Sequence, residues 1–171
     1  HLTEKDKNEL MASLPPHQRD ARSKGVPALG SGAVFQIPED EIKIQPFEIP
    51  KHFKRLYGFD VGWNNTACAW GAFDPETDVI YVTHTYKRGQ SEPAIHAQAI
   101  KERGDWIVGA IDPASRGRQQ ADGEQLINLY RGQGLNLILA DNAVEAGIFD
   151  MYERMSTSRF KVFSTCHEFF D

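Results

Sequence analysis

The pattern of hydrophobic and polar positions divides the chain into an irregular first part and a regular second part. Residues 1–52 are rich in glycine and proline, which predicts an extended arm with, at most, short strands near 33–35 and 42–44. From residue 53 onward, strands with short turns between them are predicted at 56–61, 66–73 and 79–86. Short turns connect antiparallel neighbours, so these strands should form a meander.

After residue 90 the pattern alternates between amphipathic helices and buried strands. Helices are predicted at 91–103, 122–131 and 142–155, with another beginning at 166, and strands at 106–111, 135–140 and 159–163. A meander followed by strand–helix–strand units predicts an α/β fold with a mixed sheet and helices on both faces. This order of elements resembles the ribonuclease H-like architecture.

Composition narrows the classes of protein that fit this pattern. The chain has 171 residues, which suits one domain plus an arm, and its aromatic content of 11% argues against disorder as the main state. It contains no apolar run of the roughly 18 to 20 residues that a membrane span needs. The net charge is -5, so nucleic acid could be bound only through a local arrangement of residues.

Two aspartates stand out against the predicted strands. Asp60 interrupts the apolar strand at 56–61, and a buried carboxylate needs a partner or a cation. The alternative is an aspartate that faces solvent because strand side chains alternate. Asp112 ends the strand at 106–111, where helix capping is the alternative role. If the two strands are neighbours, both carboxylates can converge on a divalent ion, because hard cations prefer oxygen ligands.

Three further residues are weaker candidates for the same site. Asp141 follows the strand at 135–140 and could reach the cleft, although capping of the next helix also explains it. Arg116 and Arg118 lie in the polar loop after Asp112 and could contact phosphates, although a solvated loop fits as well.

Three segments carry a family resemblance: DVGWNNTA at 60–67, IDPASRG at 111–117 and LADNAVEAG at 139–147. They resemble the nuclease domain of the large terminase subunits of tailed bacteriophages. The resemblance implies a metal-dependent endonuclease that cuts concatemeric double-stranded DNA by two-metal phosphodiester hydrolysis, with Mg²⁺ or Mn²⁺. Asp60 and Asp112 map onto the family's catalytic metal-binding acids.

The resemblance also predicts how the chain relates to a larger packaging machine. Residues 1–52 would be the linker that follows an ATPase domain, and 53–171 would be the nuclease domain, truncated at its C-terminus. No GxxxxGK[ST] phosphate loop is present, and the family's third acid is expected beyond residue 171. The implied partners are double-stranded DNA, the portal protein and the small terminase subunit, with no membrane, in the host cell cytoplasm.

Two other functions stay open at this point. The segment from Asp60 to Thr66 also resembles the first phosphate loop of actin-like ATPases, although a second glycine-rich phosphate turn is missing. A catalytically dead ribonuclease H-like docking domain is the other alternative, because two strand acids without a third ligand could form an inactive site.

Overall fold

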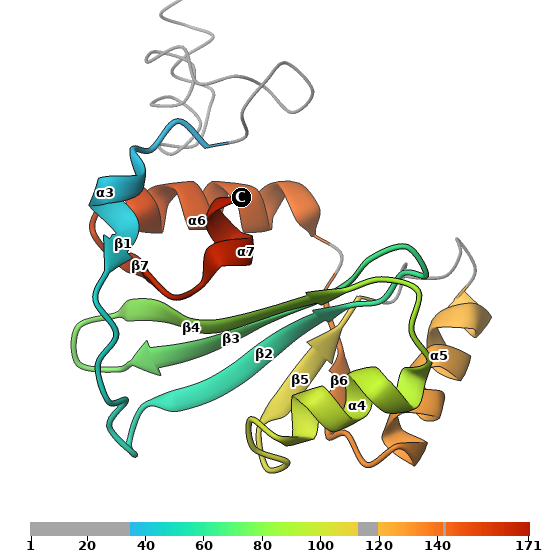
Figure 1. Ribbon diagram of the computed structural model, residues 1–171. Coiled ribbons are helices and arrows are strands. Elements are labelled where there is room, and N and C mark those ends of the chain that lie inside the picture. The colour runs from blue at the N-terminus through green and yellow to red at the C-terminus, as the bar shows by residue number, and fades with distance from the viewer. Residues whose placement is uncertain (1–34, 113–119, 142) are drawn as a thin grey trace, which may run out of the picture.

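The computed structural model describes residues 35–112, 120–141 and 143–171. Its strands form one seven-stranded mixed sheet in the order β1-β7-β4-β3-β2-β5-β6 (Figure 1). The elements are α3 (Glu39–Ile42), β1 (Lys43–Ile44), β2 (Lys54–Asp60), β3 (Thr66–Asp74), β4 (Val79–Arg88), α4 (Pro93–Lys101), β5 (Val108–Ile111), α5 (Gln120–Gly132), β6 (Leu137–Leu139), α6 (Val144–Ser156), β7 (Phe160–Phe163) and α7 (His167–Phe170).

The sheet combines an antiparallel half with parallel additions. β2, β3 and β4 pair antiparallel in chain order, as the short turns predicted. β5 pairs parallel with β2, and β6 pairs parallel with β5. On the other side β7 pairs parallel with β4, and β1 pairs parallel with β7. The mixed α/β sheet predicted from the sequence is therefore confirmed, with β2 between β3 and β5.

Helices cover both faces of the sheet, but each face only in part (Figure 1). On one face, α4 and α5 pack on β2, β3, β5 and β6 around buried side chains that include Tyr57, Trp70 and Tyr130. On the other face, α3 and α6 pack around β4 and β7 through a second cluster that includes Val82 and Met155. No described helix lies over β2, β5 and β6 on this second face in Figure 1, so the sheet is open there.

A β-bulge in β4 changes which residues face each side of the sheet. Trp70 of β3 pairs with His84, but the next residue, Gly71, pairs with Val82, which leaves Thr83 as the extra residue. Before the bulge, Val82 faces the cluster beneath α6. After it, Tyr86 faces the cluster beneath α4. The alternation of side chains along β4 is thus shifted by one residue at Thr83.

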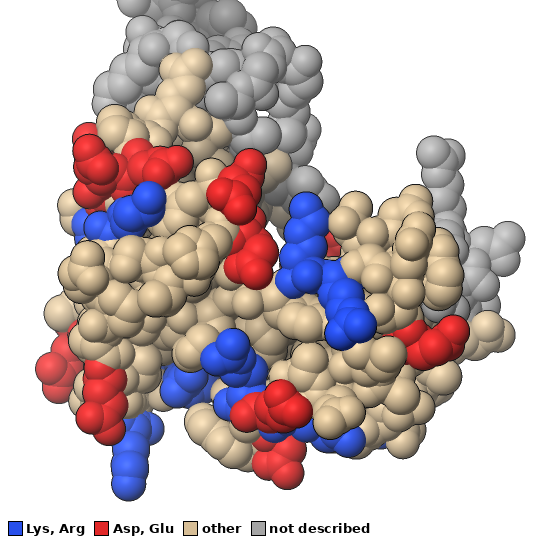
Figure 2. All heavy atoms as spheres, in the orientation of Figure 1, with Lys and Arg blue, Asp and Glu red and all other residues tan. Residues whose placement is uncertain are grey.

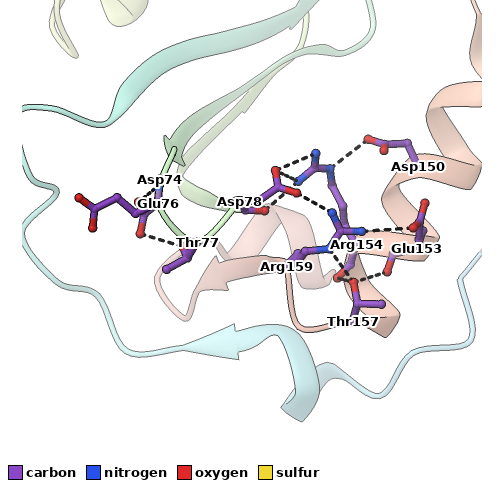
Figure 3. Close-up of polar contacts among 9 residues, drawn as sticks. All are labelled: Asp74, Glu76, Thr77, Asp78, Asp150, Glu153, Arg154, Thr157 and Arg159. Carbon is purple, nitrogen blue, oxygen red and sulfur yellow. Dashed lines mark hydrogen bonds and ion pairs between the residues drawn. The ribbon is translucent and has the colours of Figure 1, made fainter.

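A network of charged side chains fixes the β3–β4 turn to α6 and β7 (Figure 3). The Asp78 carboxylate accepts hydrogen bonds from Arg159 at 2.7 Å and from Arg154 at 3.3 Å. Arg154 also pairs with Asp150, and Arg159 pairs with Glu153. Asp78 has a positive φ of 58°, which a tight turn requires. The network therefore connects elements about eighty positions apart in the chain.

Helix and strand ends agree with the sequence predictions to within a few residues, with two differences. The helix predicted from residue 91 begins at Pro93 with Glu92 at the cap position, and the Ser91 hydroxyl donates to the Gly89 carbonyl. α3 and β1 also show that part of the predicted arm joins the sheet. The domain boundary at residues 52 and 53 stays a prediction. No helix in the described ranges is long and apolar enough to cross a membrane.

Candidate functional site

Asp60 and Asp112 lie side by side at the ends of two neighbouring parallel strands. Phe59 of β2 pairs with Ile111 of β5, and the Asp112 N–H donates to the Phe59 carbonyl at 3.1 Å. The two aspartates are the next residues in this register, on strands that neighbour each other at roughly 4.8 Å. Residues Phe59 and Ile111 point into the core beneath α4 and α5, so both aspartates point to the opposite, open face.

Both acids line one cavity on that open face, with a volume of about 430 Å³. Asp60 is exposed and Asp112 is half-buried. Asp60 therefore follows the alternation of its strand, and the expectation that it is a buried carboxylate is wrong. The convergence of the two acids does not depend on that expectation, because it follows from the strand register. The remaining walls come from β2–β6 and α7: Gly58, Phe59, Ala67, Cys68, Ala69, Thr85, Tyr86, Lys87, Ala110, Ala140, Glu168 and Phe169.

Three polar residues of this cavity were not found from the sequence. Thr85 and Lys87 face the cavity only because the bulge at Thr83 shifts the alternation of β4. Glu168 reaches the cavity from α7, more than one hundred positions after Asp60. Only the basic end of β4, YKR at 86–88, could have indicated a cation beside the site. In Figure 2 basic and acidic side chains lie beside one another near the centre of the visible face.

Glu168 adds negative charge to the cavity. The Thr85 hydroxyl donates to the Glu168 carboxylate, and this hydrogen bond is the main reason why the pKa of Glu168 lies below its usual value. Glu168 is therefore ionised at neutral pH. A cavity with three carboxylates and one lysine concentrates cations from solution, because the field of like charges adds in a hollow.

Asp141 is not among the described residues that line this cavity. Ala140, not Asp141, occupies the position beside Asp112, because the Ala140 N–H donates to the Ile111 carbonyl. The Asp141 carboxylate accepts a hydrogen bond from the Ala143 N–H at 3.2 Å, which closes a local turn before α6. The N-cap residue of α6 is Ala143, so Asp141 does not have the capping role that the sequence left open. Asp141 as a metal ligand stays a prediction. Arg116 and Arg118 lie outside the described residues.

The donor set of Asp60 and Asp112 fits a hard divalent cation. Carboxylate oxygens are the ligands that Mg²⁺ and Mn²⁺ prefer, and Mg²⁺ commonly keeps several waters beside one or two carboxylates. Within the described ranges, no three His, Cys, Asp or Glu side chains lie close enough together to hold a metal ion. Water and substrate oxygens would therefore complete the coordination.

Comparison with known proteins identifies relatives over the whole chain. The chain is 35% identical to the terminase large subunits of Salmonella phage P22 and Enterobacteria phage LP7, over alignments of 181 positions that cover all of it. It spans only 36% and 38% of the length of these two relatives. No family model matches the chain.

Solved structures show the same fold. The nuclease domain of the P22 large terminase is 34% identical, with a TM-score of 0.76, over 84% of this chain and 78% of that one. The large terminase of the thermophilic phage D6E in complex with ADP is 18% identical, with a TM-score of 0.70, over 99% of this chain and 43% of that one. The large terminase nuclease of thermophilic phage G20c with bound zinc is also 18% identical, with a TM-score of 0.51, over 75% of this chain and 80% of that one. The chain belongs to the family of terminase large-subunit nuclease domains, with the ribonuclease H-like fold.

Proposed function

We propose that this chain is a metal-dependent endonuclease, which cuts concatemeric double-stranded DNA during phage genome packaging. One observation carries the proposal: the register of β2 and β5 places Asp60 and Asp112 together on the wall of one open cavity. Terminase large subunits are among its relatives, and a terminase nuclease domain is among the solved structures that it resembles. The cavity lies on the open face of the sheet, where a large substrate has access.

Divalent cations are the cofactor that this site favours. The G20c nuclease has been solved with bound zinc and with bound magnesium, which supports a divalent requirement here. In this chain Asp60 and Asp112 would hold Mg²⁺ or Mn²⁺. Two such ions would polarise the scissile phosphate and lower the pKa of the attacking water.

The chain's own residues would position the substrate and balance its charge. Lys87 lines the cavity with both aspartates, so its ammonium group can contact a non-bridging oxygen of the DNA backbone. Arg116 and Arg118 would contact neighbouring phosphates, because they follow Asp112 in the chain. Glu168 keeps the cavity negatively charged until cations bind. DNA should therefore bind more tightly when divalent cations are present than when they are absent.

The first prediction tests the acid pair. Asp60→Asn and Asp112→Asn should each reduce nicking of plasmid DNA by at least about 100-fold, because the amide keeps the shape but loses the charge that holds the cation. The matched control is Asp105→Asn, which changes an exposed aspartate outside the cavity and should cut like wild type. Chelation with EDTA should stop cutting, and Mg²⁺ or Mn²⁺ should restore it.

Nicking by Asp60→Asn at the wild-type rate would remove this residue from the site. Repeating the assay with and without ATP separates the alternatives. Cutting without ATP supports the nuclease, and ATP binding supports the actin-like ATPase. If the chain neither cuts DNA nor binds ATP, the docking domain is supported. In the full packaging motor we place this activity in the host cell cytoplasm, with the portal protein and the small terminase subunit as partners.

A further inference from the structure

A second cavity, on the α4 side of the sheet, contains basic groups that the nuclease site does not use. Its volume is about 640 Å³, and it lies where β4 continues past the end of β7. Arg55 of β2, His84 of β4 and Arg103, after the end of α4, line it. The bulge at Thr83 is what turns His84 toward this side, while Thr85 beside it also lines the cavity of Asp60 and Asp112.

The two arginines of this cavity form no ion pair with any residue in the described ranges. Arg103 lies over the ring of Trp70, 5.9 Å from its centre, and is otherwise exposed. The Nε of Arg55 is buried without a hydrogen-bond partner. A buried guanidinium N–H without a partner is unfavourable, so a ligand that accepts this hydrogen bond would gain free energy on binding.

The pKa of His84 reflects the positive charges of both arginines. Burial and the positive charges of Arg103 and Arg55 lower the pKa of His84, so its ring is neutral at neutral pH. One acid, Glu48, lines the cavity as well. It does not pair with either arginine, so the cavity keeps a net positive charge.

We propose that this second cavity binds a phosphate group, through the guanidinium groups of Arg55 and Arg103. Two guanidinium groups match the charge and the several acceptor oxygens of a phosphate, and guanidinium groups bind such oxygens in bidentate fashion. Thr165 lines the same cavity, and its hydroxyl can supply a further donor. The phosphate belongs to a nucleic-acid strand or to a free nucleotide, and only the first source rests on the proposed nuclease function.

The test measures binding, so that it does not depend on catalysis. The whole chain is titrated in EDTA with inorganic phosphate, then with dAMP and with a single-stranded oligonucleotide, while amide chemical shifts are recorded. Saturable shifts are expected at 83–85 and at Thr165. Arg103→Gln should weaken phosphate binding about tenfold, because charge-assisted hydrogen bonds contribute that much or more. Arg103 is exposed, so this variant should remain folded.

Two variants make the test specific. Lys54→Gln removes the same charge from an exposed residue beside Arg55 that does not line the cavity, and it should bind phosphate like wild type. Glu48→Gln removes the acid from the cavity and should bind phosphate more tightly, which a merely structural role would not produce. Asp60→Asn should leave phosphate binding unchanged, so failure of the nuclease proposal and failure of this one can be told apart.

The three ligands identify the source of the phosphate. Tighter binding of the oligonucleotide than of dAMP assigns the cavity to a nucleic-acid strand, and equal binding assigns it to a free nucleotide. The proposal is overturned if phosphate shifts no signal at 83–85 or Thr165, or if Arg103→Gln and Lys54→Gln weaken binding equally. Tighter binding of a tetraglutamate peptide than of phosphate would also overturn it, in favour of an acidic protein partner.

Discussion

Gly109 is the residue whose missing side chain allows the two acids to lie side by side. It pairs with Tyr57 across β2 and β5, three residues before Asp112. A Cβ atom at Gly109 would lie within 3.0 Å of the Tyr57 ring, which is fully buried beneath α4 and α5. The glycine in this strand is therefore explained by the aromatic ring that covers it.

We expect Gly109→Ala to lower the free energy of unfolding by about 1–3 kcal/mol, because the Tyr57 ring or β5 must move. The movement should also weaken divalent binding at Asp60 and Asp112. Gly58→Ala is the matched control on the neighbouring strand, where a Cβ meets no atom within 4 Å. Its effect should stay within about 0.5 kcal/mol. Urea unfolding measures both, and equal stability of the two variants would contradict this explanation.

The sequence predicted the neighbouring positions of Asp60 and Asp112, whose role as metal ligands stays a prediction, but it did not predict the residues around them. Asp60 and Asp112 could be paired because strand order and register follow from the short turns and the buried strand before Asp112. Lys87 and Thr85 could not be placed, since one extra residue at Thr83 reverses the face of each later residue in β4. Glu168 depends on how α7 packs against β4, which local sequence does not determine.

At the level of elements, Asp78 connects the β3–β4 turn to α6 and β7 (Figure 3). The hydrogen bond from Arg159, together with the charge of Arg154, lowers the pKa of the Asp78 carboxyl. A lowered pKa means that the contribution of Asp78 to stability is complete above its unfolded-state pKa. This contribution is lost as the pH falls through the folded-state value.

We therefore expect the free energy of unfolding of the wild type to fall more steeply with acid than that of Asp78→Asn. The difference should develop below about pH 4, near the unfolded-state pKa of aspartate. Urea unfolding at several pH values between about 6 and 3 measures it. Asp105→Asn should keep the wild-type slope, and parallel curves for Asp78→Asn and wild type would contradict the network.

At the level of the whole molecule, the proposed function requires a chain with a net charge of -5 to bind a polyanion. Repulsion acts within a Debye length of about 8 Å at physiological salt, so charges in the cavity matter more than distant ones. Cations at Asp60 and Asp112 would remove that repulsion where the DNA enters. Metal binding and DNA binding should then favour each other.

Without divalent cations, the double variant Asp60→Asn/Asp112→Asn should bind duplex DNA several-fold more tightly than wild type. Mg²⁺ should remove most of this difference, because it neutralises the acids of the wild type. Fluorescence anisotropy with a labelled duplex measures both effects. The control Asp40→Asn/Asp105→Asn changes two exposed aspartates outside the cavity and makes the same change in net charge. Equal tightening in this control would show that only bulk charge matters.

The bulge at Thr83 also restricts how the length of β4 can change among related proteins. Two cavities on opposite faces take residues from the same short stretch: His84 lines one, Lys87 lines the other, and Thr85 lines both. Pairing without the bulge, with Thr83 in place of His84 opposite Trp70, would exchange the two sets, so that His84 met the acid pair and Lys87 entered the core. Related proteins are therefore expected to keep either the bulge with this number of residues between Val82 and Lys87, or a regular strand with one residue fewer.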